Sequence, residues 1–404
     1  MRKPILAALL LPLLLLPACR IADDDDESAT QPTVTQPEPA PEPPRQVSVP
    51  SVGFQRFDPA ALERYRLDPA WRTAAESDRL GRLQSGTAPQ SGAPLPPATT
   101  EPPPSPPTTA PPEDEDRILA AQVLLDRARF SPGVIDGRWG QNTEKALYWL
   151  QFARGLPPTG VLDDATFAEL ERSAAGEPVV EVEVTAADLE GPFTEVPEDP
   201  YEQAELECLC YASPAEAIAE RYHTTPEHLA KLNPEADLDA LTAGTRLSVP
   251  NVEPLDPANR QRAAGGDQVT QLLVSKRGFY TQALDAQGVV LFHFPSTVGS
   301  TYDPSPDGAY KVTGVAFEPT FHYQPTLFHE VPDDKPEAHL PAGPNAPVGV
   351  AWIDLSKPHH GIHGTAVPET IGYTSSHGCI RLTNWDALFL ARRVKPGVPV
   401  RFRD

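Results

Sequence analysis

A cysteine and a histidine near the C-terminal end of the chain have the types and the spacing needed for acyl transfer. Cys379 lies in a polar stretch beside Gly378, and His363 lies 16 residues upstream, beyond a loop that can fold back. Acyl transfer from an amide needs a nucleophile, a base, a group that orients the base, and hydrogen-bond donors for the oxyanion. An imidazole beside a thiol stabilises the thiolate. We therefore predict a cysteine nucleophile with a histidine base.

The same stretch of sequence also allows a metal site. Zn²⁺ binds histidine and cysteine, and the chain offers His359, His360, His363, His377 and Cys379. No second cysteine pair or carboxylate partner is indicated, so we expect no metal and no cofactor. A purely structural role for the cysteine and histidine is also disfavoured, because the local sequence lacks buried apolar surroundings.

Short β-type runs surround these residues. Short β-type runs separated by turns predict strands over Val269–Val274, Phe279–Leu284 and Val289–Phe294, and Trp385–Val394 is predicted to form a helix. Residues 268–404 are therefore expected to form a mainly β domain with a mixed sheet.

Two short motifs resemble a known family. IHGT at 362–365 followed by SHGCIRL at 376–382 is similar to the signature of the L,D-transpeptidase catalytic domain of the YkuD type. PSPDGAY at 304–310 and LPAGPNAPVG at 340–349 also match strings of that family. The resemblance covers residues 268–404 and implies the family's mainly β, mixed-sheet fold.

The resemblance implies a role for each residue of the predicted catalytic pair. Cys379 is the nucleophile, His363 is the general base, and the backbone carbonyl of Gly364 orients the imidazole in place of a carboxylate. His377 is a competing base because it lies two residues from Cys379, and His363 is favoured over it.

The remaining motif positions are expected to complete the site. His377, Gly378 and Cys379 shape the oxyanion hole, mostly through backbone amides, and Arg381 organises the site rather than reacting. His359-His360 stands where apolar or aromatic residues are commoner in the family. The predicted catalytic residues are Cys379, His363, Gly364, His377, Gly378 and Arg381.

The reaction implied by the resemblance acts on peptidoglycan. The thiolate of Cys379 attacks the carbonyl of the third, diamino residue of a tetrapeptide stem, releases D-alanine and leaves a thioester. An amine then gives a 3→3 cross-link, an attached protein or an exchanged amino acid. Water as acceptor would make the enzyme an L,D-carboxypeptidase. The alternative from another class is a non-catalytic wall-binding protein, which the intact motif disfavours.

The segment Phe317–Asp334 carries three aromatic residues, Phe321, Tyr323 and Phe328. Two interpretations are open. The segment forms a lid over the donor peptide, or it is a loop that places its aromatic rings in the core.

Residues 116–175 have a helical pattern. Asn142 is expected to cap a second helix and Asp163 a third, and Trp139 to pack against a turn rather than contact sugar. The string PGVIDGRWGQNTEKALYWLQFARGLPPTGVLDDATFAEL resembles the three-helix peptidoglycan-binding domain. A generic three-helix spacer is the alternative.

Residues 193–252 read as strand, helix, helix, strand. The first strand is expected from Thr194, helices begin after Ser213 and Thr225, and Arg246–Pro250 forms the last strand. LAKLNP and GTRLSVP resemble the lysin motif, which binds glycan chains, and a structural spacer is equally compatible.

Cys208 and Cys210 flank Leu209 in the expected first strand. Alternation in a strand places both side chains on one face, so a disulfide is conceivable but strained. A metal site would need further ligands. We therefore favour two small, buried or edge thiols.

The N-terminal segment has the order of an export signal. Arg2 and Lys3 precede an apolar run over Ile5–Leu16, which is too short to span a bilayer. Cys19 follows a small residue as in the bacterial lipobox, so we predict a signal peptide over 1–18 and lipidation of Cys19. The protein is then an exported lipoprotein, anchored to a membrane in the periplasm or cell envelope.

The composition agrees with several domains on a long tether. The chain has 404 residues and 50 prolines, and residues 19–115 are expected to form a disordered, acidic tether. The net charge of −23 excludes nucleic acid as a partner, since phosphate backbones bind clustered Lys and Arg. Residues 268–404 contain 11 basic and 12 acidic residues, so nearly all of the acidity lies upstream. The expected partners are peptidoglycan and a membrane.

Overall fold

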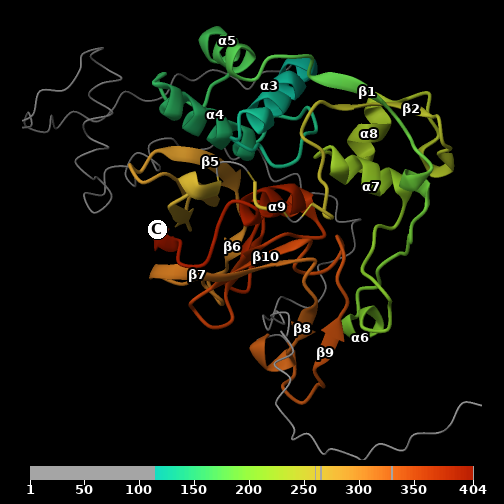
Figure 1. Cartoon of the computed structure of the whole chain (residues 1–404), viewed down its shortest axis with the longest axis vertical. Coiled ribbons are helices and arrows are strands. Elements are labelled where there is room, and N and C mark those ends of the chain that lie inside the picture. The colour runs from blue at the N-terminus through green and yellow to red at the C-terminus, as the bar shows by residue number, and fades with distance from the viewer. Residues whose placement is uncertain (1–113, 260, 264–265, 329–330, 404) are drawn as a thin grey trace, which may run out of the picture. The chain divides into compact units, whose positions relative to one another are not determined.

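The computed structural model describes residues 114–259, 261–263, 266–328 and 331–403 (Figure 1). The predicted signal peptide, the lipidation site Cys19 and almost all of the predicted tether lie outside the described residues, so they stay predictions. Every helix within the described ranges is too short or too polar to cross a bilayer.

The first part of the described chain, here called the three-helix module, contains α3 (Glu115–Arg127), α4 (Gln141–Arg154) and α5 (Asp164–Ser173). The predicted cap of the third helix is confirmed, because the Asp163 carboxylate accepts a hydrogen bond from the Thr166 amide at 2.8 Å. The predicted cap of the second helix is wrong, since Gly140 occupies the N-cap position of α4. Asn142 instead donates from Nδ2 to the Ile371 carbonyl at 2.8 Å, in a different part of the molecule.

Two buried glutamines hold the turns of this module. The Gln122 Oε1 accepts from the amides of Asp136 and Gly137, at 3.1 and 2.8 Å. The Gln151 Oε1 accepts from the amides of Thr159 and Gly160, at 2.9 and 2.8 Å. Each turn thereby gains partners for backbone groups that no helix or strand satisfies. Trp139 is half-buried against this core, as predicted.

The second part, here called the βααβ module, contains β1 (Val179–Glu183), α7 (Pro214–Arg221), α8 (Pro226–Leu232) and β2 (Arg246–Pro250). β1 pairs antiparallel with β2, with Val180 opposite Val249. Ser213 and Thr225 cap the two helices, as predicted, and accept hydrogen bonds from Glu216 and His228 at 3.1 Å each.

The prediction that the first strand of this module begins at Thr194 is wrong. The strand is β1, upstream of that residue, and residues 184–212 form an insertion between β1 and α7. The insertion contains η2 (Ala187–Leu189) and α6 (Pro200–Gln203), and η3 (Leu238–Ala240) precedes β2. Prolines at 192, 197 and 200 remove ladder donors from the insertion, which explains why it does not form the strand.

Cys208 and Cys210 form a disulfide, so the favoured prediction of two free thiols is wrong. The two residues do not belong to a regular strand. The chain bends at the buried Leu209, and the Cα atoms of the cysteines are 5.2 Å apart, within the range that a disulfide spans. Within the described ranges no group of His, Cys, Asp and Glu could hold a metal ion.

The third part, residues 266–403, is here called the sheet domain. Its main sheet has eight strands in the order β13-β11-β10-β7-β14-β3-β4-β5. The strands are β3 (Gln271–Ser275), β4 (Tyr280–Leu284), β5 (Val290–Pro295), β7 (Gly308–Phe317), β10 (Ala351–Leu355), β11 (Gly361–His363), β13 (Ile380–Arg381) and β14 (Pro399–Arg403). The β11–β13 and β14–β3 pairs are parallel and the others antiparallel, which confirms a mainly β domain with a mixed sheet.

Shorter elements complete this domain. They are β6 (Val298–Gly299) paired with β12 (Ser375–Ser376), β8 (Phe321–Tyr323) paired with β9 (Ala338–Leu340), α9 (Asn384–Ala391), η4 (Gly266–Gln268), η5 (Pro325–Leu327) and η6 (Pro368–Thr370). α9 is the helix predicted near Trp385, and Ala387 and Leu390 pack into the core beside the sheet. The sheet curls, since Thr297, just after β5, bridges Arg381 in β13 at the opposite edge.

The aromatic residues of the predicted lid segment lie in the core. Phe321, Tyr323 and Phe328 are buried together with Trp352 and Leu340 in one apolar cluster. Of the two interpretations, the structure therefore agrees with a loop that places its rings in the core.

Candidate active site

The parallel pairing of β11 and β13 brings the two predicted reactive residues to one place. Ile362 pairs with Ile380, and His363 with Arg381. The two isoleucines belong to the main apolar core, so His363 and Arg381 face the other side of the sheet. Cys379 lies two residues before Arg381, and the same alternation places its side chain on the side of His363. The loop between them folds back as predicted.

The ring of His363 is fully buried and held on two sides. Its Nδ1 is 2.7 Å from the Gly364 carbonyl oxygen, and its ring stacks on Trp352 with centroids 5.2 Å apart. A carbonyl only accepts, so Nδ1 carries the proton and donates it, while Nε2 keeps the lone pair. Gly364 thus stands in the position that the sequence predicts for an orienting group.

The environment of His363 keeps its ring neutral. Burial is the largest cause, the positive charge of Arg381 the second, and together they lower the pKa of His363 to about 3. The hydrogen bond to Gly364 acts in the opposite direction. The imidazole is therefore in its basic form at neutral pH, and a thiolate beside it would stabilise the protonated form.

Cys379 is buried, with 2% of its surface exposed, and it packs in the apolar cluster that contains Trp352 and Phe328. The prediction that apolar surroundings are missing is therefore wrong. The apolar side chains come from β8, β9 and β10, far from Cys379 in sequence. Its Sγ lies 4.0 Å from the carbonyl oxygen of His359.

Hydroxyl groups fix the turn at the thiol. Gly378 has φ +106°, a conformation that favours glycine, and its carbonyl accepts from the Ser305 Oγ at 2.9 Å. The Ser305 Oγ in turn accepts from the Gly299 amide at 2.8 Å. The Ser376 Oγ donates to the Cys379 carbonyl at 2.5 Å. The Ser376 Oγ also accepts from the Gly378 amide at 3.3 Å, so the hydroxyl groups bond both the carbonyl and the amide groups of this turn.

The other two predicted site residues have different surroundings. The His377 Nε2 lies 3.8 Å from Asp303, and its ring packs on Phe328 at 5.5 Å between centroids. Arg381 is buried, and its backbone pairs in both directions with Thr297, at 2.9 and 3.0 Å. Arg381 thus supplies a fixed positive charge near His363, which agrees with an organising role.

His359 and His360 form the loop over the turn. His360 Nδ1 lies 2.9 Å from the Pro358 carbonyl oxygen, and its Nε2 lies against Gly378, 3.1 Å from where a Cβ would stand. Burial lowers the pKa of His360. The pair His359-His360, where the sequence departs from the family pattern, therefore lies beside the turn that contains Gly378 and Cys379.

Sequence reasoning missed Asn384 as a member of this site. Its Oδ1 accepts from the Val350 amide at 3.2 Å, and a Cβ on Gly364 would stand 2.1 Å from the same oxygen. Its position just after the motif at 376–382 was the available signal. Trp352 was also missed, and the sequence around it gave no signal.

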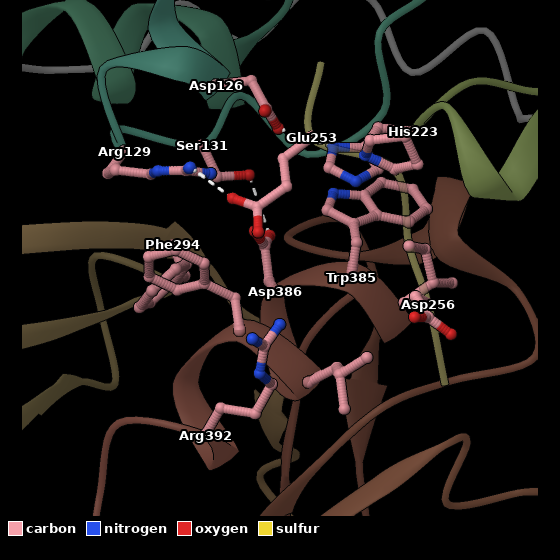
Figure 2. Close-up of a pocket in the computed structure, with 14 residues that line it drawn as sticks. Asp126, Arg129, Ser131, His223, Glu253, Asp256, Phe294, Trp385, Asp386 and Arg392 are labelled. Carbon is pink, nitrogen blue, oxygen red and sulfur yellow. Dashed lines mark hydrogen bonds and ion pairs between the residues drawn. The ribbon is translucent and has the colours of Figure 1, made fainter. Parts of the chain in front are cut away.

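A pocket lies apart from these residues, where the three parts of the chain meet. Figure 2 shows the His223 ring over Trp385 and Ser131 beside Asp386. The rings of His223 and Trp385 are 4.9 Å apart and nearly parallel. The residues that line this pocket do not include Cys379 or His363, so the pocket lies at a junction between modules and is not the candidate active site.

Comparisons with known proteins agree with this division of the chain. Residues 270–401 match the sequence model of the YkuD family, described as the L,D-transpeptidase catalytic domain. The sheet domain is a YkuD-type L,D-transpeptidase catalytic domain. Residues 114–170, which hold nearly all of the three-helix module, match a model described as "Putative peptidoglycan binding domain". The lysin-motif resemblance of the βααβ module stays a prediction.

Related proteins carry the same family name. The protein named "Putative L,D-transpeptidase YkuD" of Bacillus licheniformis is 29% identical over 185 residues, 46% of this chain and 90% of the relative. "Probable L,D-transpeptidase YbiS" of Escherichia coli K12 is 42% identical over 67 residues, 17% of this chain and 22% of the relative. The solved structure of L,D-transpeptidase 3 from Mycobacterium tuberculosis is 16% identical, with a TM-score of 0.28, over 41% of this chain and 77% of that one.

Proposed function

We propose that the protein is an L,D-transpeptidase that acts on peptidoglycan stem peptides through a thioester on Cys379. The observation that carries the proposal is the pairing of β11 with β13, which places Cys379 on the side of a His363 whose Nδ1 is held by a backbone carbonyl. The presence of this pair within a YkuD-type catalytic domain supports the assignment.

In the first half of the proposed reaction, the thiol proton moves to the Nε2 of His363 as the sulfur attacks the carbonyl of the third stem residue. A C–S bond forms, and the oxyanion accepts hydrogen bonds from backbone amides beside Cys379. The C–N bond to D-alanine then breaks, and the proton on His363 passes to the leaving amine. The products are free D-alanine and the thioester.

In the second half, the amine of another stem attacks the thioester. His363 takes the proton of that amine and returns it to the sulfur as the C–S bond breaks. The product is a 3→3 cross-link and the free Cys379 thiol. With water in place of the amine, the same steps give a shortened stem.

The other parts of the chain are proposed to hold the enzyme at its substrate. The match of the three-helix module to a peptidoglycan binding domain supports wall binding by that module. We further propose glycan binding by the βααβ module, and export with a lipid anchor at Cys19, on the sequence patterns alone.

A purified tetrapeptide muropeptide tests this function, incubated with and without an acceptor amine and followed by mass spectrometry. We expect D-alanine release and a cross-linked product, and a carbapenem adduct on the peptide that contains Cys379. Cys379→Ala should abolish all three results, and His363→Ala should slow them by ~10²–10⁴, the usual contribution of a general base. The exposed His339 provides the matched control, because His339→Ala should leave the rates unchanged.

Two outcomes would overturn the proposal. Unchanged turnover by Cys379→Ala would remove the nucleophile assignment. A shortened stem as the sole product in the presence of the amine would make the enzyme an L,D-carboxypeptidase.

A further inference from the structure

One helix of the βααβ module places two buried carboxylates against the sheet domain. Glu216 and Glu220 lie one turn apart on α7 and are only 5% and 4% exposed. Glu220 accepts from the Asn384 Nδ2 at 2.6 Å, and Glu216 accepts from the Asn345 Nδ2 at 3.0 Å. Both partners are side-chain amides of the sheet domain, and Asn384 is the first residue of α9.

Buried carboxylates are costly unless they are well hydrogen-bonded. Here they accept bonds from side-chain amides, and Tyr211 lies beside them. Burial and the charges of Glu220 and Glu216 raise the pKa of Tyr211 well above its usual value. Hydrogen bonds require defined angles, so this contact fixes the amide orientations more firmly than an apolar contact would.

The side-chain amide of Asn384 also contacts the backbone around the candidate active site. Its Nδ2 also donates to the Pro344 carbonyl at 3.0 Å, and its Oδ1 accepts from Val350. With both ends bonded, the amide cannot rotate. It is packed so closely on Gly364 that a Cβ at that glycine would collide with the Asn384 Oδ1.

Gly364 is the residue that orients His363. Its carbonyl holds the Nδ1 of His363, and its amide donates to the Ala351 carbonyl at 3.2 Å. A continuous series of direct contacts therefore runs from Glu220 through Asn384 and Gly364 to the imidazole.

The same module also contacts the surroundings of the thiol. Leu209, between the two disulfide-bonded cysteines, is fully buried in the apolar cluster that contains Cys379. Its amide donates to the Ala342 carbonyl at 3.0 Å, and its carbonyl accepts from the Asn345 amide at 2.9 Å. Both members of the reactive pair thus depend on packing against this module.

We propose that Glu220 is a positioning residue for His363, acting through Asn384 and Gly364, and that the βααβ module is thereby part of the catalytic site. The inference rests on the proposed function, because it takes His363 as the base for Cys379. It assigns the module a role beyond binding glycan.

The test measures how fast iodoacetamide alkylates Cys379 in the full-length chain at neutral pH, by mass spectrometry of the peptide that contains it. Glu220→Ala should lower the rate about tenfold, part of the ~10²–10⁴ that a general base contributes. Glu220→Gln should restore most of the rate, because its amide oxygen still accepts from Asn384. In the His363→Ala background, Glu220→Ala should have no further effect.

Two controls separate positioning from general loosening of the module. Asn345→Ala removes the companion amide–carboxylate contact of the same helix, and Glu227→Ala changes an exposed glutamate on α8. Glu227→Ala should alkylate at the wild-type rate. Asn345→Ala, whose side chain also donates to the Cys210 carbonyl beside Leu209, should change the rate by less than Glu220→Ala does. ¹⁵N-histidine NMR provides a direct signature, because the tautomer of His363 with the proton on Nδ1 should lose population in Glu220→Ala but not in Asn345→Ala.

A wild-type alkylation rate in folded Glu220→Ala would overturn the proposal, and so would a full additional loss in the His363→Ala background. If Glu220→Ala does not fold, Glu220→Asp serves, since it keeps the charge but is too short to reach Asn384. Alkylation needs no peptidoglycan, so the outcome is independent of muropeptide turnover. If the wild-type enzyme does not turn over muropeptides but Glu220→Ala still slows alkylation as expected, only the proposed function is rejected.

Discussion

The two edges of the main sheet are covered in different ways. At β5, the three-helix module packs aromatic rings on the sheet, with Trp149 and Tyr280 5.4 Å apart and Tyr280 and His293 equally close. Residue Phe130 forms a parallel bridge to His293, so that the module also extends the sheet. Near β13, the βααβ module contacts the sheet domain through the carboxylates of α7 and the backbone of Leu209.

The two kinds of contact have different effects: one stabilises the fold, and the other orients the groups that it joins. Apolar packing has no preferred direction and contributes free energy in proportion to the area buried. Hydrogen bonds to a carboxylate require defined angles and therefore fix the groups that make them. The rings at β5 make the first kind of contact, and the bonds of α7 to Asn384 and Asn345 are of the second kind.

Trp149→Ala is expected to have the largest effect on stability. The ring is buried between α4 and β4, so its loss should lower the free energy of unfolding by about 3–5 kcal/mol. Alkylation of Cys379 in the folded variant should stay at the wild-type rate, because this contact lies at the other edge. Denaturant unfolding gives the first quantity and mass spectrometry the second. A large loss of thiol reactivity in the folded variant would erase the contrast between the edges.

Leu209→Ala should affect both stability and reactivity. Leu209 is fully buried beside Cys379, so we expect a loss of about 2–5 kcal/mol in the free energy of unfolding. Because the cavity opens in the thiol's own cluster, alkylation of Cys379 should also change, unlike in Trp149→Ala. The same two measurements apply, and an unchanged alkylation rate would show that Leu209 contributes packing alone.

Lys145→Met should stabilise the β5 edge. Lys145 is buried in α4, and burial lowers its pKa to about 7 from 10.5. The unfolded chain binds this proton more tightly, so the wild-type free energy of unfolding rises from pH 7 to 10.5. The variant should lack this rise and exceed the wild-type Tm at pH 7 by roughly 2–4 °C, the shift for about 1 kcal/mol.

The hydrogen bond that Lys145 donates to the Phe279 carbonyl is replaceable, because the Ser296 amide donates to the same oxygen at 2.9 Å. Lys335→Met, at an exposed lysine, is the control and should leave the Tm and its pH dependence unchanged. A lower Tm for Lys145→Met at every pH would show that the ammonium group stabilises the edge.

Asp386→Asn tests the junction in Figure 2, with the smallest expected effect. Burial and then the charge of Asp126 raise the pKa of Asp386 to about 8, from 3.8. The folded state binds this proton more tightly, so its stabilising contribution is complete below pH 3.8 and is lost as the pH rises to 8. The neutral amide still accepts from Ser131, so the variant should have a Tm about 2 °C above wild type at pH 8–9. Equal Tm curves from pH 4 to 9 would contradict the expected titration.

The residues of the candidate site could be named from the sequence because their signals are local. Cys379, His363 and Gly364 lie within one short stretch, and each has a chemical reason to be there. The strands β3, β4 and β5 lie in short β-type runs separated by turns, which are local signals as well. The site residues and the strands depend on residues that are close in the sequence, so they can be recognised from the sequence alone.

The supporting residues could not be predicted, because their partners are distant. Glu220 and Asn384 are 164 positions apart, and a glutamate on a helix is ordinarily solvated. The burial of Cys379 depends on apolar residues from other strands, so its own polar neighbours were misleading. The expected strand at Thr194 failed because Val179–Glu183 has the better alternation and lies outside the prolines of the insertion.

The bridge between Phe130 and His293 has a consequence for how the folded protein meets other molecules. An uncovered strand at the edge of a sheet is a template for pairing with another chain. The three-helix module belongs to the same chain as the sheet domain, and it bridges β5 at His293. The folded molecule therefore does not offer this stretch of the edge to its neighbours.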